Sequence, residues 1–168
     1  MIILHILGLV FFVTFMLIVF RGAPYVPTKR ADVTKLFDEL SLGDKDVIVD
    51  LGSGDGRLLL EAAKRGISSV GYELNPFLVL VSWMRLRKYE GRARVAMRDF
   101  WLTYLPKRTK VVFVFLGTPF MKKLDNYLLR QMQHRDDELL LVSYGVPVPG
   151  REPVRETGAF LVYAYKKP

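Results

Sequence analysis

The segment Val47–Arg57, which reads VIVDLGSGDGR, constrains the fold more than any other part of the chain. An apolar run typical of a β-strand leads into Asp50, three glycines follow at alternate positions, and an apolar helical pattern begins after them. Because glycine has no Cβ, the backbone of such a turn can approach a ligand closely above the end of the strand. The segment therefore predicts a ligand site at the carboxyl end of a buried strand.

A second acid follows at a spacing that is typical of nucleoside recognition. The segment Ser69–Tyr72 is predicted to be the next strand, and Glu73 ends it about twenty residues after the glycines, where an acid can accept both ribose hydroxyls. A dinucleotide fingerprint would need a third glycine where Arg57 stands, and a Walker loop would need Gly-Lys-Ser/Thr. The pattern therefore favours a nucleoside cofactor, and the alternative is a turn that only joins a strand to a helix.

The glycine turn behind Asp50 resembles the first motif of class I S-adenosylmethionine-dependent methyltransferases. This resemblance implies that the cofactor is S-adenosyl-L-methionine, which carries no phosphate and so tolerates acids near the turn. It further implies that the methionine part of the cofactor is held by Asp50, Gly52, Ser53 and Gly54. Glu73 would then accept the hydroxyls of the ribose.

The same resemblance assigns the adenine to the segment after the third strand. An acid at that place commonly accepts a hydrogen bond from the adenine amino group, and an apolar neighbour lies against the ring. Asp99 and Phe100 are therefore predicted to bind adenine. The alternatives are that Asp99 caps a helix and that Phe100 is a core residue.

Predicted strands and helices alternate along the rest of the chain, and a hairpin ends it. Helices are expected over 33–40, 56–65, 75–90 and from 118 onward, strands at 69–73, 93–97, 109–116 and 139–144, and a hairpin over 151–167. This order predicts an α/β, Rossmann-like, doubly wound and mainly parallel sheet with an antiparallel C-terminal hairpin. Prolines at 147 and 149 exclude the helix that such folds usually carry before the hairpin.

Residues 1–20 form an almost unbroken apolar run that is interrupted only by a histidine, a glycine and a threonine. As a helix this run would be about 30 Å long, which is enough to cross the hydrocarbon core of a bilayer. We predict one transmembrane anchor at 1–20, a proline-containing linker at 21–30 and a methyltransferase domain at 31–168. Basic residues directly after the run place the domain on the cytoplasmic or mitochondrial matrix side. A buried helix or an uncleaved targeting segment is the alternative.

The composition removes several classes of site. The chain of 168 residues has no cysteine and two histidines, so disulfides, thiolate metal sites and a histidine-based triad are disfavoured. Its formal net charge is +8. A basic cluster is formed by Arg85, Arg87, Lys88, Arg92 and Arg94. It is either a solvated face or a contact with a membrane lipid surface, and no nucleic-acid partner is expected because no recognition module accompanies the charge.

Three further motifs resemble the small membrane-associated protein-lysine methyltransferases, whose mitochondrial members modify the c subunit of ATP synthase and the ADP/ATP carrier. They are Pro24-Tyr25-Val26-Pro27, Gly71-Tyr72-Glu73-Leu74-Asn75-Pro76 and Pro149-Gly150-Arg151-Glu152-Pro153-Val154. The resemblance implies that the acceptor is a lysine of a membrane protein. Methylation of a membrane lipid or quinone, and a cofactor-binding module without catalysis, are the alternatives.

The acceptor is expected beside the strand that ends near Leu116 and Gly117. Tyr25 and Trp101 are further candidates for binding the substrate, and Trp101, Tyr104, Phe115 and Phe120 are expected to line an aromatic cleft. Such a cleft would lower the pKa of an acceptor lysine, because burial disfavours its charged form. The Asn/Asp-Pro-Pro-Tyr/Phe motif of base N-methyltransferases is missing, and the sequence assigns no catalytic base.

Overall fold

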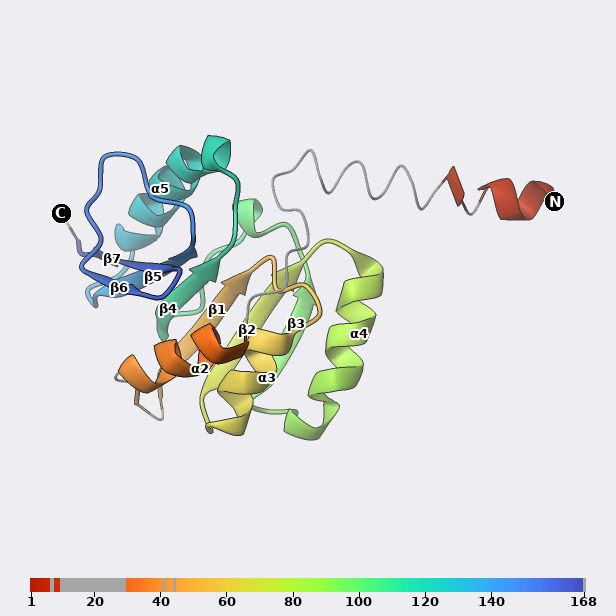
Figure 1. Ribbon diagram of the computed structural model, residues 1–168, viewed down its shortest axis with the longest axis horizontal. Helices are drawn as coiled ribbons and strands as arrows, with labels where there is room; N and C mark the ends of the chain where they lie inside the picture. Colours follow the sequence, from red (N-terminus) through yellow and green to blue (C-terminus); the bar gives the residue numbers. More distant parts are fainter. Residues whose placement is uncertain (7, 10–29, 41, 44, 168) are drawn as a thin grey trace.

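A seven-stranded mixed sheet forms the centre of the computed structural model, which describes residues 1–6, 8–9, 30–40, 42–43 and 45–167 (Figure 1). The strands are β1 (Val47–Leu51), β2 (Ser68–Glu73), β3 (Ala93–Met97), β4 (Thr109–Val114), β5 (Leu139–Tyr144), β6 (Arg155–Thr157) and β7 (Phe160–Tyr165). Their order across the sheet is β3-β2-β1-β4-β5-β7-β6. Strands β1 to β5 run parallel to one another, whereas β7 runs antiparallel to its two neighbours, β5 and β6. The predicted α/β sheet with a C-terminal hairpin is confirmed.

The strand order reverses at β1, which has β2 on one side and β4 on the other. The chain first adds β2 and β3 on one side of β1, and it then returns to add β4 and β5 on the other side. Such a switch point opens a crevice at the carboxyl ends of the strands, where ligands of α/β proteins bind. The glycine turn that follows β1 therefore lies at the place where this topology favours a ligand.

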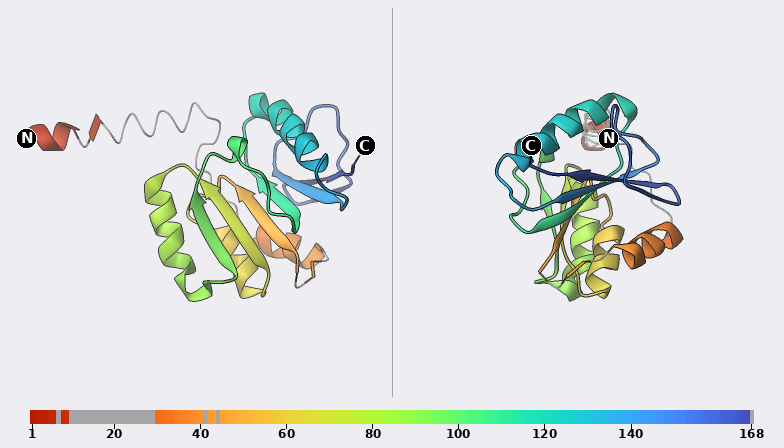
Figure 2. Two further views of the ribbon diagram at one scale, coloured as in Figure 1. Left: turned by 180° about the vertical axis from the view of Figure 1, so that it is seen from behind. Right: turned by 90° about the vertical axis from the view of Figure 1, so that its left-hand side faces the viewer.

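Helices cover both faces of the sheet. They are α2 (Arg30–Glu39), α3 (Arg57–Lys64), α4 (Pro76–Leu86) and α5 (Thr118–Met132), with short 3-10 turns η1 (Arg87–Tyr89) and η2 (Phe100–Leu102). Figure 2 shows α5 on one face and α2, α3 and α4 on the other. The Asn75 side chain caps α4 by accepting from the amides of Phe77 and Leu78. The helix predicted over 75–90 ends earlier, because its last turn is the 3-10 turn η1.

Two apolar layers hold the helices on the sheet. The layer under α5 includes Leu124 and Leu128, and it packs on the inner positions of β1, β4 and β5. The layer on the opposite face includes Leu36 and Phe37 of α2, and the Phe37 ring stacks on that of Phe113 at 5.8 Å. Helix α2 therefore covers a face of the sheet.

A loop replaces the helix that was predicted to be missing before the hairpin. Val148 is buried in the layer under α5, and its amide donates to the Tyr163 hydroxyl. Arg151 Nε donates to the buried carboxylate of Asp125 on α5 at 2.5 Å, and the Tyr165 hydroxyl donates to the same oxygen. In longer versions of the fold a helix covers this face. Here the loop covers it with Val148 and with the ion pair between Arg151 and Asp125.

The predicted anchor and linker fall mostly outside the described residues, and so does Tyr25. Residues 2–6 and 8–9 are helical, and Arg30, the last predicted linker residue, is the first residue of α2. Within the described ranges, none of the helices combines the length and the apolar character that a bilayer span requires.

Gly56 is expected to tolerate no side chain, because a Cβ there would lie 2.1 Å from Ser82 Oγ of α4. We expect Gly56→Ala to lower the free energy of unfolding by about 2–4 kcal/mol. This loss is the sum of the cost of a left-handed backbone at a residue with a Cβ and the cost of overpacking against Ser82. Gly91→Ala is the matched control, since Gly91 is also left-handed at φ +92° but has open space around its Cβ position. Gly91→Ala should lower the free energy of unfolding, measured by urea denaturation, by only about 1 kcal/mol. Equal losses in the Gly56→Ala and Gly91→Ala proteins would contradict the steric argument.

Candidate cofactor and acceptor site

The glycine turn after β1 leaves open space above it. Gly52 has φ +93°, and a Cβ built on it would have no heavy atom within 4 Å. The amides of Gly52 and Ser53 donate to the Tyr72 carbonyl at 2.9 and 3.0 Å, which folds the turn toward β2. The turn therefore presents bare backbone to a hollow at the carboxyl edge of the sheet, as a closely approaching ligand requires.

Glu73 is fixed on this turn by three backbone amides. Its Oε2 accepts from Gly54 N at 2.9 Å, and its Oε1 accepts from Leu74 N and Asn75 N at 2.8 Å each. The side chain is buried and points at the glycine turn, as the predicted ribose role requires. A carboxylate offers about four lone-pair sites. One site therefore remains for a ribose hydroxyl, and a second hydroxyl would have to share an oxygen with an amide.

Asp50, at the fourth position of β1, is a buried acid that forms no ion pair with the cations in the described part of the chain. Burial raises the pKa of Asp50 to about 7, and the negative charges of Glu73 and Asp55 act in the same direction. Among the residues that the structure describes, none donates a hydrogen bond to its carboxylate. An ammonium group would complete this environment, so the site fits the methionine part of S-adenosylmethionine.

Asp55 has the opposite surroundings, although it is only five residues away. Arg57 Nη2 lies 2.9 Å and Arg85 Nη1 lies 2.6 Å from Asp55 Oδ2. Burial by itself would raise the pKa of Asp55, but the hydrogen bonds and charges of Arg57 and Arg85 outweigh it and hold that pKa below its ordinary value. Asp55 is therefore a satisfied ion pair that ties the turn to α4.

Ser53 contributes to the turn by packing. Its hydroxyl is buried and finds no hydrogen-bond partner in the described part of the chain. A Cβ on Gly71 of β2 would lie 2.4 Å from Ser53 Oγ and 2.6 Å from Leu59 Cδ1. Gly71 thus makes room for both side chains, a role that its place in the sequence motif did not reveal. The predicted contact of Ser53 with the cofactor would then fall to its backbone.

The two adenine candidates have structural roles already. Asp99 Oδ1 accepts from Trp101 N at 3.0 Å and caps η2. The Phe100 ring is buried in the layer under α5, with its centroid 4.5 Å from that of Trp101 and 6.3 Å from that of Tyr127. Asp99 is half-buried and its Oδ2 has no donor among the described residues, so it can still accept from an adenine amino group. Both adenine contacts stay predictions.

The four aromatic residues expected in one acceptor cleft are divided by the sheet. Trp101 and Phe120 pack on the layer under α5, and Lys123 Nζ lies 4.2 Å from the Trp101 ring centroid. Phe115 instead contacts Tyr144, which packs on the opposite layer. Tyr104 is exposed beside His134. The single aromatic cleft was therefore a wrong prediction, because side chains alternate between the two sides of the sheet at the end of β4 and Phe115 faces the side opposite to Trp101 and Phe120.

The end of β4 keeps its place as the candidate acceptor position. The Leu116 side chain is buried in the layer under α5, so only its backbone can face a substrate. Gly117 is half-buried and precedes the first turn of α5, with φ −67°. Because β4 adjoins β1 in the sheet, this segment lies next to the glycine turn. The two predicted backbone contacts are therefore compatible with the position, and they stay predictions.

Gly52→Val is expected to leave the fold intact and to abolish binding of S-adenosylmethionine, because the side chain would enter the hollow. Gly150→Val is the matched control, since Gly150 has φ +76° and open space at its Cβ position. Both changes should cost a similar free energy of unfolding, on the order of 1–2 kcal/mol for a left-handed residue. Calorimetric titration with the cofactor should separate them. Equal affinities in the two variants would contradict the assignment of the hollow.

Comparisons with known proteins agree with this geometry. Residues 50–155 match the family described as ANTKMT methyltransferase domain. The ATP synthase C-subunit lysine N-methyltransferase of Homo sapiens is 33% identical over 147 residues, which are 84% of this chain and 60% of that protein. The adenine nucleotide translocase lysine N-methyltransferase of Mus musculus is 33% identical over 147 residues, which are 83% of this chain and 62% of that protein.

A solved structure with the same architecture contains the product form of the cofactor. The RNA methyltransferase from Salinibacter ruber, in complex with S-adenosyl-L-homocysteine, has a TM-score of 0.73 and 25% sequence identity, and the match covers 85% of this chain and 94% of that one. The chain spans 56–65% of the length of the first curated relatives that it matches.

Proposed function

This chain belongs to the family of the ANTKMT methyltransferase domain, a group of S-adenosylmethionine-dependent methyltransferases, and on this premise we propose that it methylates a lysine of a membrane protein. The observation that carries the cofactor half of this proposal is the pair of buried acids, Asp50 and Glu73, at a turn of bare backbone. The acceptor half is supported by the relatives, which are named for lysine methylation of the C subunit of ATP synthase and of adenine nucleotide translocase.

The residues of the chain would act by binding and alignment. Bound S-adenosylmethionine supplies an activated methyl group on its sulfonium. Asp50 would hold the ammonium of the cofactor and Glu73 its ribose, while the glycine turn excludes side chains from the hollow. A displacement at a methyl carbon needs mainly correct alignment and a neutral nucleophile. Half-buried Phe115 directly follows β4, and an apolar surrounding there would favour the neutral form of an acceptor lysine.

We also propose that residues 1–20 anchor the protein in a membrane as a single pass. The apolar run of the sequence is long enough for a span, and Arg21, Lys29 and Arg30 follow it. These residues favour an orientation with the domain on the cytoplasmic or mitochondrial matrix side. The anchor would keep the domain close to lysines that lie near a membrane surface.

This function can be tested by incubating the full chain with isolated membranes and with S-adenosylmethionine that is labelled in its methyl group. The expected result is label in a protein band that yields methyl-lysine on hydrolysis, and no label with Glu73→Ala. Label that extracts into organic solvent would favour a lipid or quinone acceptor and contradict the proposal. Label in RNA would contradict it as well, and tight cofactor binding without transfer to any fraction would indicate a binding module.

A further inference from the structure

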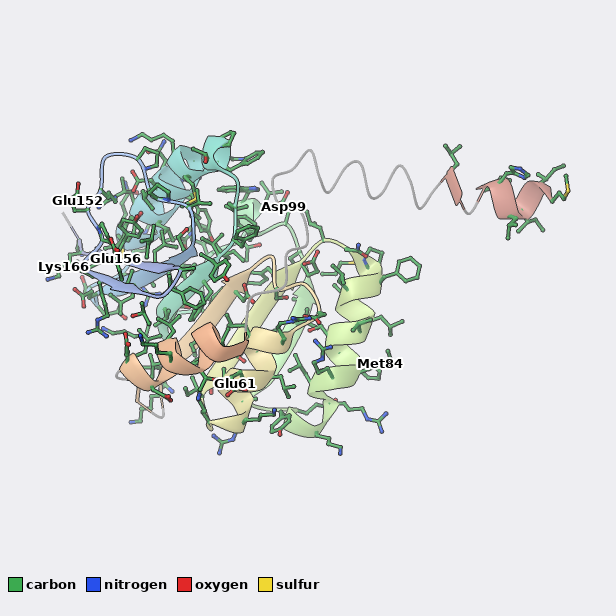
Figure 3. All side chains as sticks on the ribbon, viewed as in Figure 1. Glu61, Met84, Asp99, Glu152, Glu156 and Lys166 are labelled. Atoms are coloured by element: carbon green, nitrogen blue, oxygen red, sulfur yellow. The ribbon has the colours of Figure 1, made fainter. Side chains whose placement is uncertain are left out.

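The outer side of α4 exposes large apolar residues. Leu80, Trp83 and Met84 are 52%, 53% and 50% exposed, and Val81 is 37% exposed. Leu80 and Met84 are one helical turn apart, and Val81 and Trp83 lie beside them on the same side. Figure 3 labels Met84 on the side of α4 that is turned away from the sheet. Contiguous exposed apolar residues of this size mark an interaction surface.

The inner side of α4 carries the small residue instead. Ser82 is fully buried and packs against Gly56, where even a Cβ would collide with its hydroxyl. Leu86 is the other buried residue of this helix. A surface helix normally turns its large apolar side chains toward the core. Because α4 keeps four large apolar side chains exposed on its outer side, these residues are available to another partner.

Exposed cations adjoin these apolar residues at the end of the helix. Between Pro76 and Arg98 the chain has six basic residues and one acidic residue, Glu90. Arg87 and Lys88 follow α4 directly in η1, are exposed and form no ion pair with any described residue. Arg94 is exposed as well, but it alternates with Ala93, which packs with Leu86 of α4, so Arg94 faces the other side of the sheet. We call Arg87 and Lys88, together with Leu80, Val81, Trp83 and Met84, the α4 face.

The basic cluster predicted from the sequence is thereby redrawn. Arg85 is removed from it, because its guanidinium pairs with Asp55 and donates to the Asp55 carbonyl. Arg92 Nη1 is engaged with the Gly66 carbonyl at 2.5 Å. Arg94 is removed from it as well, because its side of β3 faces the layer under α5 and not α4.

We propose that the α4 face rests on the surface of an anionic phospholipid bilayer. Apolar side chains with a tryptophan among them match the boundary between acyl chains and headgroups, and the adjoining cations Arg87 and Lys88 match anionic headgroups. A symmetric dimer through this face would bring these cations of two copies together, which disfavours it. The apolar run at residues 1–20 is a separate indication that the chain works at a membrane.

This placement has a consequence for the site. Helix α4 begins directly after Glu73 and its cap Asn75, at the edge of the sheet that carries the glycine turn. A domain that lies on the bilayer through α4 therefore holds the cofactor hollow close to the membrane surface. The anchor alone would leave the orientation of the domain free, whereas contact through α4 fixes it.

Trp83 provides a direct test, because the chain has only two tryptophans. Trp101→Phe leaves Trp83 as the single tryptophan of the full chain, so its emission can be excited selectively. After reconstitution into vesicles of phosphatidylcholine with phosphatidylserine, the Trp83 emission should shift to the blue and be quenched by brominated lipid, and phosphatidylcholine alone should give a weaker effect. A solvent-exposed, unquenched Trp83 in both vesicles would overturn the proposal. A shift that depends on protein concentration and not on lipid would indicate a dimer and would overturn it too.

Matched variants test the two components of the α4 face. Arg87→Gln with Lys88→Gln should lower the ratio of docked to undocked domain, measured by quenching, by about fivefold for each charge removed. Lys107→Gln with Arg108→Gln removes the same charge from an exposed loop before β4 and should leave the ratio unchanged. Leu80→Ser with Met84→Ser should abolish docking. The control is Leu129→Ser on α5, which should leave docking unchanged. Equal losses in variants and controls would overturn the proposal.

The docking proposal and the proposed function can fail separately. Gly52→Val should dock normally although it binds no cofactor, and Leu80→Ser with Met84→Ser should bind the cofactor with unchanged affinity. Unchanged thermal unfolding of the vesicle-free variants would show that the substitutions act on docking and not on folding.

Discussion

Glu73→Gln is expected to lower the affinity for S-adenosylmethionine by about a hundredfold. A hydrogen bond to a charged acceptor contributes about 1.5–3 kcal/mol, and glutamine removes the charge that a ribose hydroxyl would meet. The three amides around Glu73 leave no good orientation for glutamine. Its NH2 group must face either the Gly54 amide or the amides of Leu74 and Asn75, and two donors cannot pair. Calorimetry with the full chain measures the affinity.

Glu90→Gln is the control for this change. Glu90 is an exposed acid between α4 and β3, so its replacement should leave the affinity unaltered. Thermal unfolding without cofactor separates a binding loss from a folding loss. A Glu73→Gln protein that unfolds normally and still binds S-adenosylmethionine tightly would remove Glu73 from the site.

Asp50→Asn is expected to stabilise the cofactor-free protein and at the same time to weaken its binding of the cofactor. The pKa of Asp50 is raised from 3.8 to about 7, because burial disfavours its charged form. Above pH 7 the folded protein therefore holds an unfavourable buried negative charge. Asparagine removes that buried charge. The gain in free energy of unfolding should be on the order of 4 kcal/mol at pH 8, from a shift of about three pKa units. Binding should weaken because the ammonium of the cofactor loses its counter-charge.

The pH dependence gives the sign of this effect. Between pH 3.8 and about 7 the folded protein keeps a proton on Asp50 that the unfolded chain has released. Stability therefore falls as pH rises through this window, and the Asp50→Asn protein should lack that part of the decline. The two proteins should be equally stable below the window and differ most above it. Urea denaturation across this pH range measures the difference.

Asp55→Asn is the matched control, and it should act in the opposite direction. Because Asp55 pairs with Arg57 and Arg85, its removal leaves two partly buried guanidinium groups without their acid. We expect a loss of about 1–3 kcal/mol in the free energy of unfolding. A stabilised Asp55→Asn protein, or a destabilised Asp50→Asn protein at pH 8, would refute the electrostatic account of the turn.

The contrast between Asp50 and Asp55 shows where sequence reasoning ended. Both acids belong to the same short motif; the resemblance assigned Asp50 to the cofactor, and of Asp55 the sequence stated only that an acid is tolerable there. The structure separates them through Arg85, which lies thirty residues farther along the chain and reaches Asp55 from α4. No local pattern predicts such a pairing, because it depends on the angle at which α4 crosses the turn.

Aromatic residues and Ser53 illustrate the same limit. Spacing along the chain placed Trp101, Phe115 and Phe120 near the acceptor, but the sheet lies between Phe115 and the other two. The hydroxyl of Ser53 is buried against β2 because Gly71 leaves space for it. In both cases the side of the sheet that a residue faces decided the outcome, and this side depends on the packing around each strand end.

The sequence by itself determined the order of strands and helices, the glycine turn and the cofactor class. These features follow from local chemistry: only glycine adopts φ +93° at Gly52 without strain, and Glu73 directly ends a strand. Tertiary structure alone decided which acid lacks a cation and which side of α4 faces outward. Helix α4 is apolar around most of its circumference, so its pattern could not reveal a buried side. The close contact of Ser82 with Gly56 settles that choice, because only small residues fit there, and it turns the large side chains away from the protein.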